Sequence, residues 1–208
     1  MGTNRIRVLL ADDHAVLRMG LVTLLARTPD IEVVAEAGNG EEAVGEAERY
    51  APDVAVVDLV MPKMDGIAAT AMIHSKFPNM KILILTSFGT SDEISKALST
   101  GADGAILKSA ATHELVDAIR RIAAGERPVS PEIENMMKID PPIQELSPRQ
   151  REILESMTRG LTTNQIASTF DISPESVKTH VAKLFEKIGA ANRSEAVAIA
   201  LRKHLLKI

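Results

Sequence analysis

Residues 54–62 read VAVVDLVMP, a run of four apolar residues that ends directly in Asp58. Valine is enriched in strands, and a short apolar run without polar alternation predicts a strand that is buried on both faces. Strands of this kind are typical of parallel sheets, because helices cover both faces of such a sheet. We therefore predict that Asp58 follows the carboxyl end of a central parallel strand.

The chain repeats this unit of strand and helix on both sides of Asp58. Apolar runs predict four further strands, at residues 6–11, 31–35, 82–85 and 105–107. Helical spacing of apolar residues follows each of the five strands, at residues 16–25, 41–49, 67–74, 91–99 and 115–123. This alternation predicts an α/β fold, and right-handed crossovers then build a five-stranded doubly wound parallel sheet.

Polar side chains stand at the ends of the predicted strands. The first strand ends in Asp12 and Asp13, the fourth in Thr86 and Ser87, and the fifth in Lys108. In open α/β sheets, functional residues collect at the carboxyl ends of the strands. In a flavodoxin-like strand order the first and third strands are neighbours, so three carboxylates would share one cleft.

Such a cluster of carboxylates predicts a particular chemistry. Like charges at close range are unfavourable unless something neutralises them, and Mg²⁺ with oxygen ligands does so economically. A lysine and a hydroxyl group complete a site for a transferred phosphoryl group. Because a carboxylate can itself act as the nucleophile, the cluster predicts an aspartyl phosphate.

Together with their surroundings, these side chains resemble the receiver domain of two-component response regulators. The resemblance covers about residues 5–125 and also includes Met61-Pro62, Asp65-Gly66 and Gly101-Ala102. It implies that Asp58 is the phosphoacceptor and that a sensor histidine kinase is the donor. It also implies that Asp13, Asp58 and the main-chain carbonyl of Val60 ligate Mg²⁺, with Asp12 acting mainly through water.

The resemblance further implies a switch around the phosphoryl group. Lys108 would pair with the phosphoryl oxygens, and Thr86, with Ser87 beside it, would move to hydrogen-bond the group and report it. The family usually places an aromatic residue three positions before the lysine, but Ala105 stands there. An aromatic rotation therefore cannot be the switch, and the relay from the site to the surface is open.

One motif points to a different function. Residues 38–43 read GNGEEA, which matches the G-x-G-x-x-A fingerprint of dinucleotide-binding proteins. Its two glutamates would repel a pyrophosphate, and it follows the second strand, whereas the fingerprint normally follows the first.

A phosphatase that used Asp58 would need a second acid at position 60, where Val60 stands. We expect no enzyme, because phosphoryl transfer to the chain's own carboxylate is stoichiometric.

From residue 145 onward the alternation stops, and a separate all-α domain of four helices is predicted. Ser-Pro pairs at 147–148 and 173–174 are helix-start signals, and Gly160 and Gly189 are helix-end signals. The predicted helices span residues 148–159, 164–170, 174–188 and 192–205. A short helix, a tight turn and a longer basic helix predict a helix-turn-helix.

Several motifs in this half resemble the LuxR-type helix-turn-helix over about residues 144–206. They include LSPR at 146–149, NQIA at 164–167, SVKTH at 176–180 and NR at 192–193. With the receiver resemblance, they identify the chain as similar to the NarL/FixJ class of response regulators. Helix starts donate to phosphates, and lysines read guanine edges or hold phosphates. The residues expected to contact DNA are Thr163, Asn164, Lys178, Thr179, Ala182 and Lys183.

The charge pattern supports this division into two domains. Residues 1–126 carry 12 Lys and Arg against 18 Asp and Glu, whereas residues 145–208 carry 10 against 7. An acidic body with a basic tail domain suggests that the tail meets a polyanion. Residues 127–144 contain four of the ten prolines and are predicted to be a linker between a receiver at 1–126 and the helix-turn-helix at 145–208. A short helix at residues 131–137 is compatible with this linker.

Composition restricts the remaining alternatives. The chain has 208 residues and no cysteine, which excludes a disulfide scaffold and thiol chemistry and fits a reducing cytosol. No apolar run approaches the length of about 18–20 residues that spans a bilayer. We therefore expect a cytoplasmic protein without membrane contact.

These observations predict a phosphorylation-controlled, DNA-binding transcriptional regulator. The resemblance to this class implies that phosphorylation promotes a homodimer through the first and fifth predicted helices, near Val16 and residues 115–122. The dimer would bind double-stranded promoter DNA at inverted or tandem half-sites, and RNA polymerase is a further partner that this function implies. The alternative is a regulator of the same fold that binds DNA independently of phosphorylation, as Ala105 suggests.

Overall fold

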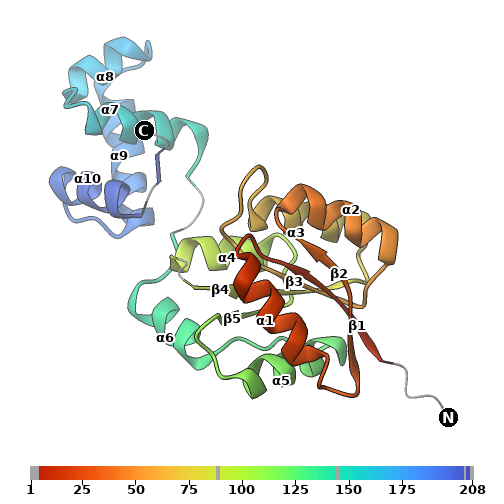
Figure 1. Ribbon diagram of the computed structural model, residues 1–208. Helices are drawn as coiled ribbons and strands as arrows, with labels where there is room; N and C mark the ends of the chain where they lie inside the picture. Colours follow the sequence, from red (N-terminus) through yellow and green to blue (C-terminus); the bar gives the residue numbers. More distant parts are fainter. Residues whose placement is uncertain (1–4, 88–89, 144–145, 204, 207–208) are drawn as a thin grey trace. The chain divides into compact units, whose positions relative to one another are not determined.

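The computed structural model describes residues 5–87, 90–143, 146–203 and 205–206 (Figure 1). Its packing divides the chain into two compact units, residues 1–141 and 142–208. The division lies within the proline-rich stretch, although residues 144 and 145, at the predicted start of the second domain, fall outside the described ranges. None of the helices in these ranges has the length and apolarity needed to cross a membrane.

A five-stranded parallel sheet forms the centre of the first unit (Figure 1). Its strands are β1 (Ile6–Ala11), β2 (Ile31–Ala37), β3 (Val54–Val57), β4 (Lys81–Thr86) and β5 (Gly104–Leu107). The spatial order is β2-β1-β3-β4-β5, and each neighbouring pair is parallel. This order confirms the predicted doubly wound fold, and it places Ala11 at the end of β1 opposite Val57 at the end of β3.

Helices cover both faces of this sheet (Figure 1). They are α1 (Ala15–Leu25), α2 (Gly40–Tyr50), α3 (Gly66–Lys76), α4 (Ser91–Ser99), α5 (Thr112–Ala123) and α6 (Pro131–Ile139). Alternate residues of β1 separate the two layers: Val8 and Leu10 pack with α1 and α5, whereas Leu9 and Ala11 pack with α2, α3 and α4. All four residues of β3 are buried, as its continuous apolar run predicted.

The segment expected to be a linker packs on the first unit along most of its length. The N–H of Ala105 in β5 donates to the carbonyl of Pro128 at 2.9 Å, and the N–H of Ser130 donates to the carbonyl of Ala105 at 3.0 Å. Helix α6 follows, and its Ile133 is fully buried in the core on this side of the sheet. The expected linker thus contains a helix that docks on the first unit, because its apolar residues gain more from burial than from exposure to water.

The second unit contains, within residues 146–206, four helices. They are α7 (Pro148–Thr158), α8 (Thr163–Thr169), α9 (Pro174–Ile188) and α10 (Arg193–Arg202). The predicted caps are confirmed: the side chains of Ser147 and Ser173 accept hydrogen bonds at the starts of α7 and α9. Gly189 ends α9 in the left-handed region, at φ 70°. A core of their own apolar side chains holds the four helices together.

Candidate functional site

Asp58 lies directly after β3 and is almost fully buried, with 3% of its surface exposed. Its N–H donates to the carbonyl of Ala11 at 2.9 Å, which continues the pairing of β3 with β1. In the loop that follows, the N–H of Gly66 at the start of α3 donates to the carbonyl of Leu59 at 2.9 Å. The sheet and this loop therefore hold the Asp58 carboxylate beside the end of β1.

Lys108 connects the two buried carboxylates of the site. Its Nζ lies 2.6 Å from Oδ2 of Asp58 and 2.7 Å from Oδ2 of Asp12. Lys108 follows β5, and its main-chain N–H donates to the carbonyl of Thr86 at the end of β4, at 2.8 Å. The ends of four strands thus meet at one edge of the sheet, as the positions of their polar residues predicted.

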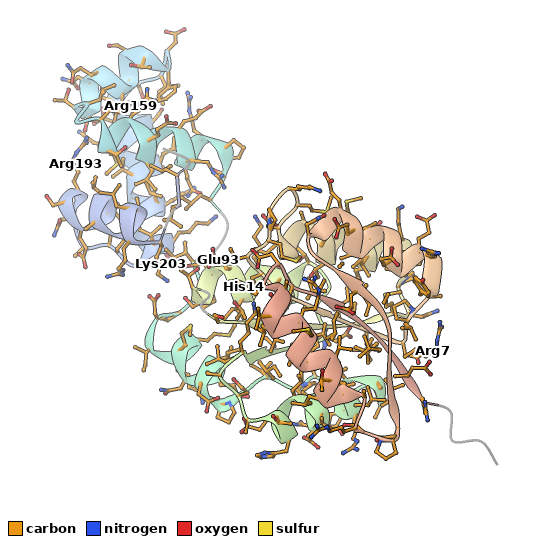
Figure 2. The ribbon with its side chains drawn as sticks, in the orientation of Figure 1. Arg7, His14, Glu93, Arg159, Arg193 and Lys203 are labelled. Carbon is orange, nitrogen blue, oxygen red and sulfur yellow. The ribbon has the colours of Figure 1, made fainter. Side chains whose placement is uncertain are left out.

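Asp13 and His14 form the exposed side of the cluster. His14 is the N-cap of α1 (Figure 2). Nδ1 of His14 lies 2.7 Å from Oδ1 of Asp13 and 3.3 Å from Oδ1 of Asp12. The main-chain N–H of His14 also donates to Oδ1 of Asp12 at 2.8 Å. His14 was not among the predicted site residues, and its position directly after the paired aspartates was the signal that could have found it.

The environment shifts the pKa values of Asp58 and Lys108. Burial raises the pKa of the Asp58 carboxyl; the hydrogen bond and charge of Lys108 oppose this, and the Asp12 carboxylate adds to it. Burial alone would lower the pKa of Lys108, but its hydrogen bonds to Asp12 and Asp58 outweigh burial and raise it. Lys108 is therefore an ammonium at neutral pH, and its single charge is shared by two carboxylates.

The remaining residues predicted for this site lie around the cluster. Thr86 is fully buried, whereas Ser87, the next residue, is exposed. Val60 is 63% exposed, and its N–H donates to Oδ1 of Asp58 at 3.4 Å. The functions expected of Thr86, Ser87 and the Val60 carbonyl stay predictions.

The cluster is a suitable set of ligands for a hard divalent cation. Asp12, Asp13, His14 and Asp58 each offer one ligand atom, and these atoms all lie within 4.8 Å of one another. Oδ2 of Asp12 is buried, and the Lys108 ammonium lies 2.7 Å from it. Three of the four groups are carboxylates, which are the ligands that Mg²⁺ prefers.

The GNGEEA stretch serves packing and helix capping. The N–H of Gly40 donates to the carbonyl of Met64 at 3.1 Å, and a Cβ on Gly40 would lie 2.5 Å from the same oxygen. Oε2 of Glu42 accepts from the N–H of Gly38 at 2.8 Å. The glycine therefore lets the loop after β3 approach the start of α2, which accounts for a motif that resembled a nucleotide fingerprint.

Ala105 is fully buried, and its neighbours explain its size. It belongs to the same apolar cluster as Ile94 of α4 and Ile133 of α6. A large aromatic ring at position 105 would compete with these side chains, because protein interiors leave few voids larger than a water molecule. The small side chain of Ala105, where the receiver pattern has an aromatic residue, is therefore consistent with the docking of α6.

Helix α9 has one buried face and one exposed face. Val177, Leu184 and Ile188 recur at helical spacing and are buried in the core of the second unit. The opposite side carries the residues predicted to face DNA, and all four are exposed: Lys178, Thr179, Ala182 and Lys183. The exposed face thus offers the basic and methyl-bearing side chains that base recognition uses.

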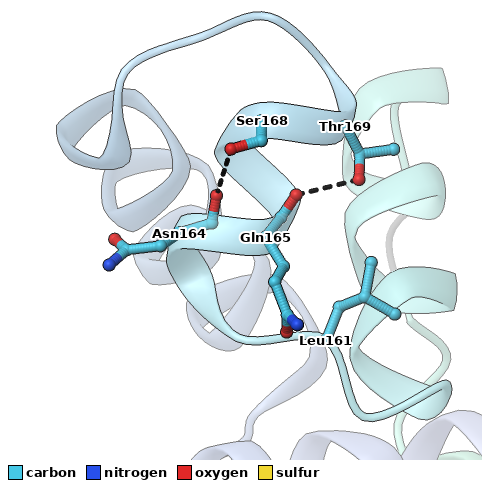
Figure 3. Close-up of a pocket in the computed structure, with 5 residues that line it drawn as sticks. All are labelled: Leu161, Asn164, Gln165, Ser168 and Thr169. Atoms are coloured by element: carbon cyan, nitrogen blue, oxygen red, sulfur yellow. Dashed lines mark hydrogen bonds between the residues drawn. The ribbon is translucent and has the colours of Figure 1, made fainter.

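Thr163 and Asn164 stand in the first turn of α8. The N-cap is Thr162, whose side chain accepts from the N–H of Gln165. Figure 3 shows the open pocket along this helix and the side chain of Asn164 pointing away from Leu161. The residues that line the pocket are Leu161, Asn164, Gln165, Ser168 and Thr169. The start of α8 therefore presents polar groups toward solvent.

Comparison with known proteins matches both units. The model of the response regulator receiver domain matches residues 8–120, and that of the luxR family of bacterial regulatory proteins matches residues 144–200. Response regulator protein VraR of Staphylococcus aureus is 37% identical over 207 residues, covering 97% of this chain and 99% of its own.

Solved structures show the same relationship. The response regulator ChrA of a heme-sensing two-component system is 38% identical, with a TM-score of 0.57, and the match covers 98% of this chain and 100% of that chain. A LuxR-family response regulator from Aurantimonas sp. SI85-9A1 is also 38% identical, with a TM-score of 0.62, covering 65% of this chain and 96% of that chain. RcsB in complex with DNA, at 23% identity and a TM-score of 0.70, shares the fold over 96% of this chain and 99% of that chain.

The family models together span both units, and the relatives cover nearly the whole chain. The acidic cluster at the strand ends lies within the first matched range, and α9 lies within the second. This chain belongs to the NarL/FixJ class of two-component response regulators, phosphorylation-controlled transcription regulators that join a receiver to a LuxR-type DNA-binding domain.

Proposed function

We propose that Asp58 is the phosphoacceptor and that a sensor histidine kinase supplies the phosphoryl group. The observation that carries this proposal is the position of Lys108 Nζ, 2.6 Å from Asp58 and 2.7 Å from Asp12. An ammonium held there can pair with the oxygens of an incoming phosphoryl group. Burial raises the pKa of Asp58, and a more basic carboxylate is a stronger nucleophile.

The transfer makes one bond and breaks one. A carboxylate oxygen of Asp58 attacks the phosphorus of a phosphohistidine, the P–N bond breaks, and its electron pair stays on the imidazole of the kinase. Asp58 becomes an acyl phosphate carrying a charge of about −1.5 to −2. Lys108 then pairs with the phosphoryl oxygens, and the hydroxyl group of Thr86 donates to the same group, with Ser87 at the exposed edge.

Mg²⁺ would be held by Asp12, Asp13, Asp58 and the Val60 carbonyl. When bound, it supplies neutralisation of the charge on the phosphoryl oxygens. Support for this assignment comes from the ligand atoms that cluster within 4.8 Å and from the buried Oδ2 of Asp12.

We also propose that the second unit binds double-stranded promoter DNA as part of a homodimer. Lys178, Thr179 and Ala182 would face the bases, with Lys183 beside them, and the two lysines would also be placed to meet phosphates. Thr163 and Asn164 would meet phosphates at the start of α8. Dimerisation through α1 and α5 has support from Val16 and Met19 on α1, which are 80% and 64% exposed. A cytoplasmic location and contact with RNA polymerase belong to the same proposal.

Phosphorylation is expected to increase the DNA affinity of the full chain, because a dimer engages two half-sites at once. The experiment compares wild type and Asp58→Ala, each with and without acetyl phosphate and Mg²⁺, by fluorescence anisotropy on a duplex selected from a random pool. Only the phosphorylated wild type should bind tightly. Equal affinities in all four cases would contradict phosphorylation control, and no binding in any case would contradict the DNA-binding function.

Ala105 favours a second candidate function. With α6 docked beside it, the receiver lacks the aromatic residue on which the usual relay depends, and a regulator that binds DNA independently of phosphorylation would show equal affinities in that experiment. DNA binding by such a regulator would still depend on α9. The two candidate functions therefore differ only in whether phosphorylation changes the DNA affinity.

Single substitutions on α9 are expected to change the salt dependence of DNA binding. Each lysine that meets a phosphate releases counterions, so Lys178→Ala and Lys183→Ala should each reduce the slope of log K against log salt by about 1 if the lysine contacts a phosphate. The control is Lys76→Ala on α3, which removes the same charge from the first unit. A slope equal to that of wild type in both α9 variants would contradict phosphate contact by either lysine.

A further inference from the structure

Two arginines hold the two ends of α8, the short helix at the start of the helix-turn-helix. We propose that Arg149 and Arg193 are positioning residues, which fix α8 and the turn before α9 so that the DNA-contacting residues reach their places. They would do so without contacting DNA phosphates themselves. This inference rests on the proposed DNA binding by α8 and α9.

Arg193 secures the chain before α8. It begins α10 (Figure 2), and its Nη2 donates to the carbonyl of Leu161 at 2.6 Å and to the carbonyl of Met157 at 3.1 Å. Met157 lies in the last turn of α7, and Leu161 directly precedes the N-cap of α8. One guanidinium therefore joins the end of α7, the start of α10 and the loop that leads to Thr163 and Asn164.

Arg149 secures the chain after α8. Its Nη2 donates to the carbonyl of Phe170 at 3.2 Å, and its guanidinium lies 4.3 Å from the centre of the Phe170 ring. Phe170 is the C-cap of α8, and Asp171, with a φ of 51°, makes the turn into α9. The side chain of Arg149 is 31% exposed, and its Nη1 also donates to Glu152 at 3.0 Å.

Helix α8 needs such support because its own packing is small. It has seven residues, and only Ile166 and Ala167 of these are buried. A helix of this length is marginal by itself in water. Most of its other side chains are polar and exposed, including Asn164 and Ser168 (Figure 3). Contacts at its two ends therefore decide how its first turn and the following turn are oriented.

The hydrogen bonds of the two arginines argue against a direct role at phosphates. Both guanidinium groups are partly buried and donate hydrogen bonds to main-chain carbonyls of their own domain. Lys178 and Lys183 on α9, in contrast, are exposed. Lysine could not replace either arginine fully. At position 149 an ammonium lacks the planar face that stacks on the Phe170 ring. At position 193 it lacks the rigid plane that holds Nη2 between the two carbonyls.

The test measures DNA affinity and its salt dependence for the full chain with Arg193→Ala, Arg193→Lys and Arg149→Lys, on a random-sequence duplex at low to moderate salt. Arg151→Lys, an exposed position on α7, is the matched control. We expect each Arg149 or Arg193 variant to bind several-fold more weakly with the wild-type salt slope. We also expect the effects of Arg193→Lys and Asn164→Ala to be non-additive, because a positioning residue acts through the residues it positions.

Each other outcome overturns a definite part of the inference. A salt slope smaller by about 1 in Arg193→Ala would identify a direct phosphate contact. A lower melting temperature with unchanged affinity, measured well below the melting transition, would identify a purely structural role. Wild type that binds no duplex even at low salt would overturn the proposed DNA-binding function as well, whereas normal wild-type binding with unaffected variants would overturn this inference alone.

Discussion

Replacement of Asp58 by Asn is expected to abolish phosphoryl incorporation from acetyl phosphate. The amide removes the nucleophilic oxygen charge, while its similar shape keeps the hydrogen bond from Val60 and the place beside Lys108. The measurement is intact-protein mass spectrometry after incubation with donor and Mg²⁺. Chelation of Mg²⁺ should abolish incorporation into wild type as well, because the remaining positive charge of Lys108 is already shared by two carboxylates.

The matched control is Asp117→Asn on α5, whose side chain is 64% exposed. It removes the same charge from the same unit and should be phosphorylated like wild type. Incorporation into Asp58→Asn at the wild-type level would place the acceptor on another side chain and would contradict the assignment of Asp58. Peptide mapping of the phosphorylated wild type would then identify that side chain.

Replacement of Gly66 by Ala is expected to destabilise the first unit by about 3 kcal/mol. A Cβ at this position would lie 2.0 Å from the carbonyl oxygen of Asp58 and 2.8 Å from Cα of Leu59, both main-chain atoms. The substitution therefore forces the β3–α3 loop away from α3, and the Asp58 carboxylate moves with it. Urea unfolding can be followed by the fluorescence of Tyr50, the single tyrosine in a chain without tryptophan, which lies in α2.

Gly45→Ala is the control for this experiment. Gly45 is exposed in the interior of α2, and among the described residues outside its own helix turn no heavy atom lies within 4 Å of a Cβ built there. Alanine has the higher helix propensity, so this variant should be more stable than wild type by about 1 kcal/mol. If Gly66→Ala unfolds at the same urea concentration as wild type, the loop can shift without cost and the close approach is not required.

Local signals in the sequence were sufficient to predict most of the helices and strands. Strand β3 and helices α4 and α9 have the predicted bounds, because apolar period, cap residues and glycine stops are all encoded within a few neighbouring residues. The doubly wound fold followed from the alternation of these elements, and the strand order confirmed it. The polar residues at the strand ends could be predicted in the same way, because the ends of parallel strands meet at one edge.

Other features depend on contacts between residues that are far apart in the chain. A proline-rich stretch suggested a linker, yet Ile133 is buried against the sheet beside Ala105, and no local pattern revealed that β5 would accept α6. The glycines of the GNGEEA stretch suggested a nucleotide, whereas the approach of Met64 to Gly40 explains the second of them. The contacts of His14 with Asp12 and Asp13, and the hydrogen bonds of Arg193 to Met157 and Leu161, likewise come from the tertiary structure.

By itself, therefore, the sequence determined which elements form, which chemical groups stand at their ends, and which family the chain resembles. The tertiary structure decided which of those groups touch: Lys108 reaches Asp58 across a separation of 50 residues, and Arg193 reaches Leu161 across 32. The physical reason is range. Helix caps and apolar periodicity are properties of neighbouring residues. The pairing of Lys108 with two carboxylates, the docking of α6 on the sheet and the arginine contacts at both ends of α8 form only after strands and helices have packed.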